Sequence, residues 1–277
     1  MAFQITDLTC NHMKNPIGMD DVPYFSYKLV DNGSDEKLTA YQIIVDDGTM
    51  IMWNSGRVPK DKQLLIKYDG KSLKPQTRYF WRVLAWNNHG ECSESQQAYF
   101  ETGLMQPFQR EAKWITADPQ GIMVGNKTGS HTTAPYMRRE FSVSKPVFDA
   151  TLYVSGLGYY ECYINGKSVK DTVLDPAFTE YDKAVMYRTH KVTNIVQGNN
   201  AISVVLGDGF YNADTDDVWN FVNAAWRDHS KCILILSIKY EDGTREEIVS
   251  DQSFKGTKGP ILANDVRSLD RYDARLE

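Results

Sequence analysis

Short runs of alternating apolar and polar residues dominate the first hundred positions of the chain. A period of two predicts half-buried β-strands, and clusters of glycine, asparagine and aspartate separate the runs as turn residues do. The predicted strands cover residues 5–8, 23–29, 41–45, 50–53, 64–67, 77–86 and 95–101. Seven short strands within about 100 residues, with no helical period between them, predict an antiparallel β-sandwich.

The same pattern continues in the second part of the chain, with longer apolar runs. Here the predicted strands cover residues 138–143, 150–154, 159–164, 167–169, 185–192, 200–206, 232–240 and 244–249. Asn165-Gly166 and Asp242-Gly243 each separate two of these runs, and such pairs supply the positive φ angles of tight hairpin turns. This part therefore predicts a second all-β sandwich, of jelly-roll type.

Length and composition divide the chain into two domains. At 277 residues it is long enough for about two domains, and residues 103–112 have the character of a short linker. We expect one domain over residues 1–104 and another over residues 114–277.

One local pattern in the first domain is unusually specific. The run Leu-x-Pro-x-Thr-x-Tyr at residues 73–79 resembles the fibronectin type III pattern, in which the tyrosine closes a corner at a strand entry. A buried tyrosine hydroxyl needs a hydrogen-bond partner, and a tight turn offers carbonyl groups. We expect Tyr79 to bond nearby backbone and Trp81 to anchor the core rather than stack on a sugar.

Charge and hydropathy narrow the classes of partner. The chain has 31 basic and 36 acidic residues, a net charge of −5, and no basic run of the kind that phosphate backbones require. Its apolar runs are much shorter than the roughly 20 residues that span a bilayer. We expect neither nucleic acid nor a membrane as a partner. The N-terminus shows no secretory signal, which leaves the localisation undetermined.

Motifs for several common chemistries are missing. The four cysteines are far apart with no Cys-x-x-Cys spacing, the five histidines show no His-x-x-x-His spacing, and no Gly-x-Ser-x-Gly elbow occurs. Zinc, a redox pair and a serine hydrolase are therefore disfavoured. Cys162 and Cys232 lie within predicted strands, where a free cysteine usually acts as a small buried hydrophobe, although one disulfide stays possible.

Three segments carry a family resemblance. Residues 155–167 (SGLGYYECYINGK), 174–183 (LDPAFTEYDK) and 192–212 (VTNIVQGNNAISVVLGDGFYN) closely resemble the N-terminal, non-catalytic β-sandwich of bacterial α-L-rhamnosidases. The chain departs from the family at Phe178 and Phe210, where tryptophan is frequent. The resemblance implies an all-β chain, with a fibronectin type III-like sandwich followed by a jelly-roll-type β-sandwich.

The resemblance also implies a function for the parent protein. The family hydrolyses terminal α-L-rhamnosyl linkages with an acid and a base carried by a helical (α/α)6 domain, and no helical period of that kind occurs here. The chain is then an accessory region, inactive by itself, whose partners are that catalytic domain and rhamnose-containing glycans. The parent would be a bacterial protein, with a periplasmic or secreted location as one option.

The loop over residues 209–230 is the candidate binding surface, because it interleaves aromatic and acidic residues without a strand period. Aromatic faces and carboxylates suit a sugar, and calcium prefers oxygen ligands. In some rhamnosidases the resembling domain binds L-rhamnose through calcium. The sugar-binding candidates are Asp208, Tyr211, Asn212, Asp214 and Trp219, with calcium at Asp208, Asn212 and Asp214.

Three alternatives stay open. These residues could simply fix the loop and an interface to the absent domain. The chain could be a free-standing lectin or adhesin-type binding module built from the same sandwiches. It could itself be catalytic, in which case Asp208→Asn would abolish turnover.

Overall fold

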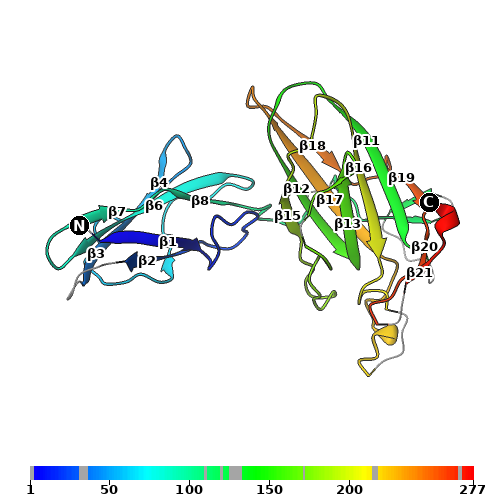
Figure 1. Ribbon diagram of the computed structural model, residues 1–277, viewed down its shortest axis with the longest axis horizontal. Coiled ribbons are helices and arrows are strands. Elements are labelled where there is room, and N and C mark those ends of the chain that lie inside the picture. The colour runs from blue at the N-terminus through cyan, green and yellow to red at the C-terminus, as the bar shows by residue number, and fades with distance from the viewer. Residues whose placement is uncertain are drawn as a thin grey trace. The chain divides into compact units, whose positions relative to one another are not determined.

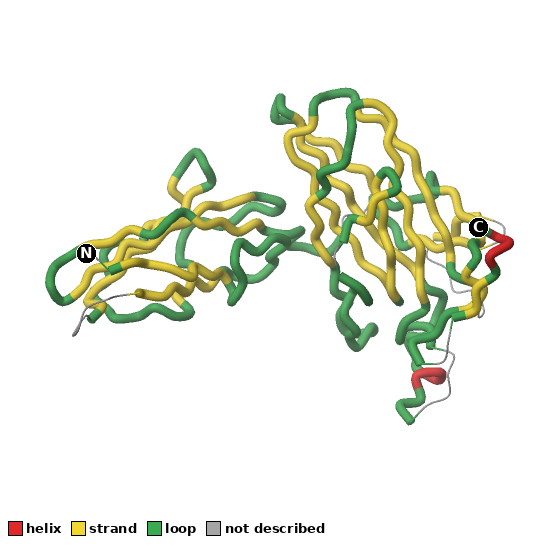
Figure 2. Tube along the Cα trace, in the orientation of Figure 1, coloured by secondary structure: helices red, strands yellow, loops and turns green. Residues whose placement is uncertain are grey.

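A computed structural model describes residues 3–30, 37–108, 111–118, 121–124, 133–170, 172–213, 218–267 and 270–277 of the chain. Strands make up nearly all of its regular structure, as Figures 1 and 2 show. Within these ranges the helical elements are two short 3-10 turns, η1 (Phe221–Asn223) and η2 (Ala274–Leu276). The predicted all-β fold class is confirmed. No helix in the described ranges is long and apolar enough to cross a bilayer.

The chain divides into two compact units, Met1–Pro107 (unit 1) and Phe108–Glu277 (unit 2). The division falls within the linker expected at residues 103–112. The expected domain boundaries, residues 1–104 and 114–277, stay a prediction.

Unit 1 contains two antiparallel sheets. The first has the order β1 (Gln4–Cys10), β2 (Tyr24–Val30) and β5 (Ile66–Lys67). The second has the order β4 (Ile51–Asn54), β3 (Leu38–Asp46), β6 (Arg78–Asn87) and β7 (Cys92–Glu94), with β8 (Ala98–Glu101) also pairing with β6.

Two predicted strands of unit 1 are shorter in the structure, for local reasons. The strand expected over residues 64–67 begins at Ile66, because Leu65 has a φ of 51° that breaks the extended backbone. The strand expected over residues 95–101 begins at Ala98. Ser95 is buried there, and its Oγ accepts the backbone N–H of Val83 at 3.0 Å, a bond that separates β7 from β8.

Strand β6 supplies the centre of the unit 1 core. Its residues alternate strictly, so that Tyr79, Trp81, Val83 and Ala85 are all buried. The ring of Trp81 lies 4.5 Å from that of Phe25, which brings the two sheets together. Trp81 is thus a core anchor.

Tyr79 forms the expected corner with a different partner group. Its hydroxyl accepts a hydrogen bond from the backbone N–H of Lys74 at 2.7 Å, where a carbonyl had been expected. The ring is fully buried and stacks on Phe100 with centroids 5.3 Å apart. The tyrosine therefore ties the entry turn of β6 to the core.

Unit 2 is a sandwich of two larger antiparallel sheets. One has the order β10 (Gly121–Val124), β9 (Ile115–Asp118), β17 (Lys231–Tyr240), β12 (Val147–Leu157) and β15 (Arg188–Lys191), with β18 (Arg245–Val249) paired to β17. The other has the order β14 (Lys167–Ser168), β13 (Tyr159–Ile164), β16 (Gly198–Gly207), β11 (Pro135–Val143) and β19 (Lys255–Lys258). A separate hairpin joins β20 (Ile261–Ala263) to β21 (Arg271–Tyr272).

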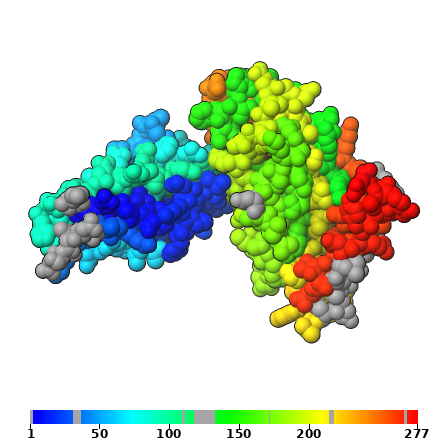
Figure 3. All heavy atoms as spheres, in the orientation of Figure 1, coloured from blue at the N-terminus to red at the C-terminus, as the bar shows by residue number. Residues whose placement is uncertain are grey.

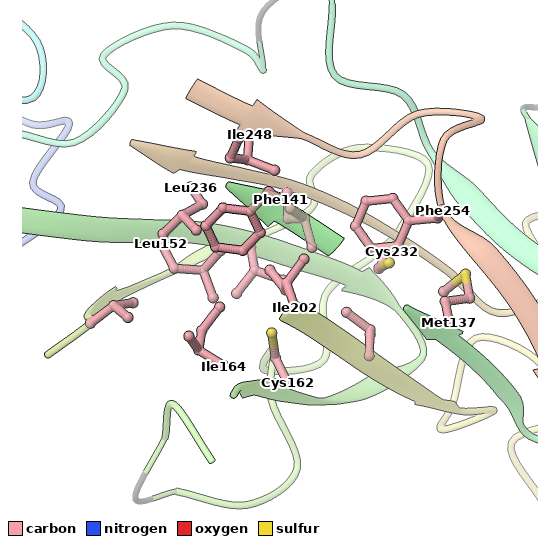
Figure 4. Packing of buried hydrophobic residues seen from close by; sticks show 14 of the residues in the cluster. Met137, Phe141, Leu152, Cys162, Ile164, Ile202, Cys232, Leu236, Ile248 and Phe254 are labelled. Carbon is pink, nitrogen blue, oxygen red and sulfur yellow. The ribbon is translucent and has the colours of Figure 1, made fainter. Parts of the chain in front are cut away.

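The core of unit 2 lies between these sheets. Figure 4 shows Leu152 and Leu236 from one sheet and Ile202 and Ile164 from the other pointing toward one another. Cys162 and Cys232 lie in the same core as free thiols, and burial raises the pKa of Cys162 to about 12. The apolar runs of the sequence thus form the inner faces of the two sheets, because burying them there removes apolar surface from water.

Two glycines of unit 2 differ in how well their positions would accept a side chain. Asn165 and Gly166 have φ angles of 50° and 77°, as a tight hairpin turn from β13 into β14 requires. Gly158 has a φ of 95°, and a Cβ there would lie 2.3 Å from the carbonyl oxygen of Gly207. Close approach of two backbones excludes a side chain at Gly158, whereas Gly166 has open space around it.

Replacing Gly158 by alanine is expected to destabilise the chain far more than replacing Gly166. The first change combines an unfavourable φ with a clash against backbone, for a cost of about 2–4 kcal/mol. The second meets only the φ penalty, about 1 kcal/mol. Urea unfolding of both variants measures the difference, and equal losses would contradict the close approach.

Tyr79→Phe is expected to lower the free energy of unfolding by about 1–2 kcal/mol, because the hydrogen bond from Lys74 disappears while ring packing is kept. Tyr24→Phe, at an exposed tyrosine of β2, serves as the control and should stay within about 0.5 kcal/mol of the parent chain. Thermal unfolding followed by tryptophan fluorescence is the measurement. A Tyr79→Phe variant as stable as its control would show that the corner bond is dispensable.

Candidate functional site

The loop between β16 and β17 begins at a buried aspartate. Oδ1 of Asp208 accepts hydrogen bonds from Nδ2 of Asn212 at 2.9 Å and from Oγ of Ser230 at 2.6 Å. Its backbone N–H donates to Oδ1 of Asn264 at 2.6 Å. A buried carboxylate is stable only with such donors, which here come from both ends of the loop, and the segment after β20 holds the backbone of Asp208. Asp208 therefore fixes where the loop leaves and rejoins the sandwich.

A buried ion pair lies at the end of the same loop. Nζ of Lys231 is 2.6 Å from Oδ2 of Asp228, and both side chains are less than a tenth exposed. Burial by itself would raise the pKa of Asp228, but the hydrogen bonds from Lys231 and from the backbone of His229 hold it below its usual value. Asp228 is consequently a carboxylate that serves as a structural partner of Lys231.

Aromatic rings pack together beside these anchors. Neighbouring centroids are 5.1 to 6.2 Å apart, mostly in edge-to-face or steeply tilted pairs, an arrangement that aromatic quadrupoles favour. Burial, aided by the charge of Asp228, raises the pKa of Tyr211 to about 12. This aromatic cluster consists of Phe178, Tyr181, Phe210, Tyr211, Phe221 and Trp226.

Part of the cluster comes from the connection between β14 and β15. The cis peptide bond of Asp175-Pro176 lies in it, and Asp175 is buried, with Thr172 donating to its carboxylate and the guanidinium of Arg188 at 3.5 Å. The carbonyl of Asp175 accepts the backbone N–H of Tyr160 at 3.0 Å. Polar groups of this connection thus face inward, toward the sandwich.

Apolar side chains of the same connection face outward. Val173 is 77% exposed, Leu174 60%, Phe178 44% and Met186 52%. Val185 is exposed as well. We call the exposed apolar side chains of residues 173–186, together with the rings of Phe210 and Phe221 that touch Phe178, the apolar surface.

Figures 1 and 3 show η1 and the β20–β21 hairpin at the same end of unit 2. Their proximity follows from the bond between Asp208 and Asn264 and from the guanidinium of Arg267, which lies 5.9 Å from the ring centroid of Phe210. Segments that are remote in the sequence therefore build this end together.

The structure separates the sequence-predicted site residues into three groups. Asp208 and Asn212 are buried and bonded to each other, and Tyr211 is buried in the aromatic cluster. Trp219 is 64% exposed. Asp214 lies outside the described residues. Sugar contacts by these five candidates stay a prediction. Among the candidates that the structure describes, Trp219 is the exposed one.

The described candidates do not fit a calcium ion. The carboxylate of Asp208 already takes an amide N–H and a hydroxyl, and Asn212 directs its NH2 group, not its oxygen, at that carboxylate. Calcium needs six to eight oxygen ligands. Within the described residues, no three His, Cys, Asp or Glu side chains gather as a metal site.

Sequence reasoning did not single out the connection over residues 172–186 as a surface. The strand that follows this connection was expected over residues 185–192, whereas β15 begins only at Arg188. One signal was available. Val173 and Leu174 stand next to each other directly before Asp175-Pro176, and adjacent apolar residues at a turn have no place in a strand alternation.

Family comparison matches both units. The Alpha-L-rhamnosidase N-terminal domain model matches residues 145–277. The model of the Rha78A-like, N-terminal immunoglobulin domain matches residues 5–106.

Individual relatives agree with these matches. An α-L-rhamnosidase of Formosa agariphila is 34% identical over 295 residues, which cover 96% of this chain and 31% of the relative. The α-L-rhamnosidase structure from Dictyoglumus thermophilum is 38% identical with a TM-score of 0.86, covering 99% of this chain and 32% of that one. The Streptomyces avermitilis α-L-rhamnosidase complexed with L-rhamnose shares the fold, with a TM-score of 0.90 at 21% identity and coverage of 100% and 43%.

The chain spans about a third of the length of the first relatives that it matches. Both matched models are N-terminal domains by description, and they follow one another here as units 1 and 2. The chain therefore belongs to the α-L-rhamnosidase family and corresponds to the N-terminal region of its members.

Proposed function

We propose that this chain is the accessory, non-catalytic N-terminal region of an α-L-rhamnosidase, and that its apolar surface packs against the catalytic (α/α)6 domain of the parent protein. The parent would hydrolyse terminal α-L-rhamnosyl linkages. Support for an accessory role comes from coverage, since the matched relatives are about three times as long as the chain. Their remaining length is ample for a separate catalytic domain.

The apolar surface is the observation that carries the proposal. A contiguous segment that exposes Val173, Leu174, Phe178 and Met186 is unfavourable in water, by about 25 cal/mol for each Å2 of apolar area that could be buried. Exposed apolar patches of this kind mark interaction sites. The segment is also well anchored by Asp175, so its shape is available before a partner binds.

The carboxylates of this region support a non-catalytic role. A glycosidase places two carboxyl groups on opposite sides of one glycosidic bond. Here Asp208 is buried under Asn212 and Ser230, Asp228 is paired with Lys231, and Asp175 lies beneath its own connection. Each serves a neighbour inside the fold rather than a substrate.

Sugar binding is the second candidate function, and the exposure of Trp219 favours it. The exposed indole of Trp219, in a loop held by Asp208, would stack on the apolar side of a rhamnose ring. In this case Asp208 and Asn212 would act by holding the base of the loop. A free-standing lectin-type module would rely on this contact alone and would leave the apolar surface uncovered.

Val173→Ser combined with Met186→Ser is expected to weaken the full-length parent but not the isolated chain. Both side chains are exposed in the chain by itself, so its melting temperature should hardly change. In the parent they would be buried, and losing about 1–2 kcal/mol of interface contact should lower the temperature of inactivation on an aryl α-L-rhamnoside by about 2–4 °C.

Val196→Ser is the matched control, because Val196 is an exposed valine of unit 2 outside the apolar surface. It should leave both temperatures unchanged. Inactivation of the full-length double variant at the same temperature as the unmodified full-length protein would contradict the docking role. Turnover of the aryl rhamnoside by the isolated chain would contradict the non-catalytic role.

Calorimetric titration of the chain with L-rhamnose tests the second candidate. Trp219→Ala should weaken binding at least tenfold, which corresponds to about 1.4 kcal/mol. Phe148→Ala removes another strongly exposed aromatic ring and should have no effect. Because the described residues form no calcium cage, a chelator should leave binding unchanged. Loss of binding with the chelator would instead indicate a calcium site that includes Asp214.

A further inference from the structure

A second surface of unit 2 lies on the outer face of the sheet that contains β13, β16 and β11. The side chains of the central strand β16 that point away from the core are small and only partly buried. They are Ala201, Ser203 and Val205, whereas Asn264 lies over Gly207. Their spacing of two residues makes a shallow floor roughly 14 Å long, at about 3.4 Å per residue.

Larger side chains rise on both sides of this floor. On β11, Tyr136 lies beside Val205 and Arg138 beside Ser203. On β13, Tyr159 lies beside Gly207 and Tyr163 beside Ser203. Small residues flanked by aromatic and charged ones form a trough that runs along β16, and we call this surface the trough.

Two adjoining hollows share the β11 and β16 part of the trough, and neither is lined by Tyr159 or Tyr163. One has a volume of about 470 Å3 and reaches from Tyr136 across β11 to Lys255. The other has a volume of about 680 Å3 and reaches toward the Asn165-Gly166 turn. Both are lined by Arg138, Glu140 and Ser203, so they share one middle section, and each falls in the size range of small-molecule sites.

The aromatic wall on β11 is held in place. A Cβ on Gly259 would lie within 2.2 to 2.6 Å of three ring atoms of Tyr136, so the ring rests directly on the glycine backbone. Burial raises the pKa of Tyr136, and the nearby Tyr163 contributes in the same direction. The ring of Tyr136 is therefore fixed before any ligand arrives.

Two pairs of opposite charges lie along the trough, and Lys255 adds a cation at its edge. Arg138 and Glu140 are 2.7 Å apart, and Lys170 lies 2.9 Å from Glu161. Paired charges leave little net field, which disfavours a phosphate backbone or another strongly charged ligand. Guanidinium, carboxylate and hydroxyl groups side by side suit hydroxyls, because each hydroxyl both donates and accepts hydrogen bonds.

We propose that the trough binds an uncharged, unbranched oligosaccharide chain lying along β16, with Tyr136 against a sugar ring and Arg138, Glu140 and Ser203 bonding hydroxyls. The length of the floor suits several linked rings rather than a single sugar. The residues that line the two hollows include neither Trp219 nor any member of the apolar surface, and the proposal does not depend on the docking role.

Native gel retardation in soluble neutral polysaccharides tests the trough, with rhamnan, xyloglucan and galactomannan as probes. The chain is expected to be retarded by at least one of them. Ser203→Trp fills the shared middle section from a partly exposed position and should reduce retardation at least tenfold. Ser144→Trp makes the same exchange at the exposed turn after β11, outside both hollows, and should be retarded like the parent chain.

A second variant keeps the result interpretable if Ser203→Trp folds poorly. Arg138→Ala removes an exposed side chain from both hollows and should weaken binding severalfold without a change in melting temperature. Three outcomes would overturn the proposal. They are no retardation by any probe, retardation that survives both variants, and binding by the isolated chain that is absent from the full-length parent, which would show that another domain covers this face.

Discussion

The two-residue alternation along β16 is the constraint on which unit 2 depends. Ile202, Val204 and Leu206 point into the core between the two sheets and cannot leave it without exposing apolar area. The same backbone then forces Ala201, Ser203 and Val205 outward. A single strand thus fixes the inside of the sandwich and the floor of the trough, because shifting it by one residue would exchange the two faces.

Polar groups close to the loops are satisfied internally, and this leaves the outside of the loops apolar. Asp208, Asp228 and Asp175 each bond neighbours within the fold. A buried carboxylate without partners would cost several kcal/mol, so these bonds decide how the chain enters and leaves each connection. Val173, Met186 and Phe178 are then exposed on the outside of the connection between β14 and β15. The apolar surface is in this sense a consequence of the buried polar anchors.

The two proposed surfaces use different chemistry and different parts of the fold. The apolar surface stands on long connections, where the sequence can vary without breaking a ladder. The trough stands on three hydrogen-bonded strands and has paired charges, so its shape depends on the register between β13, β16 and β11. A protein partner suits the former and a hydroxyl-rich chain suits the latter. The two proposals therefore assign different partners to different parts of one unit.

The sequence by itself determined what depends on local chemistry. Alternation located the longer strands but not short ones such as β9 and β19, Asn165-Gly166 located a hairpin, and the run ending at Tyr79 located a corner, since each of these signals needs only neighbouring residues. The direction of the corner bond, the inward orientation of Asp208 and Asn212, and the exposure of Val173 came only from tertiary structure. They depend on partners such as Ser230 and Asn264, which lie 22 and 56 residues from Asp208. No local pattern indicates whether a group so distant in the sequence will pack over a side chain or leave it exposed to water.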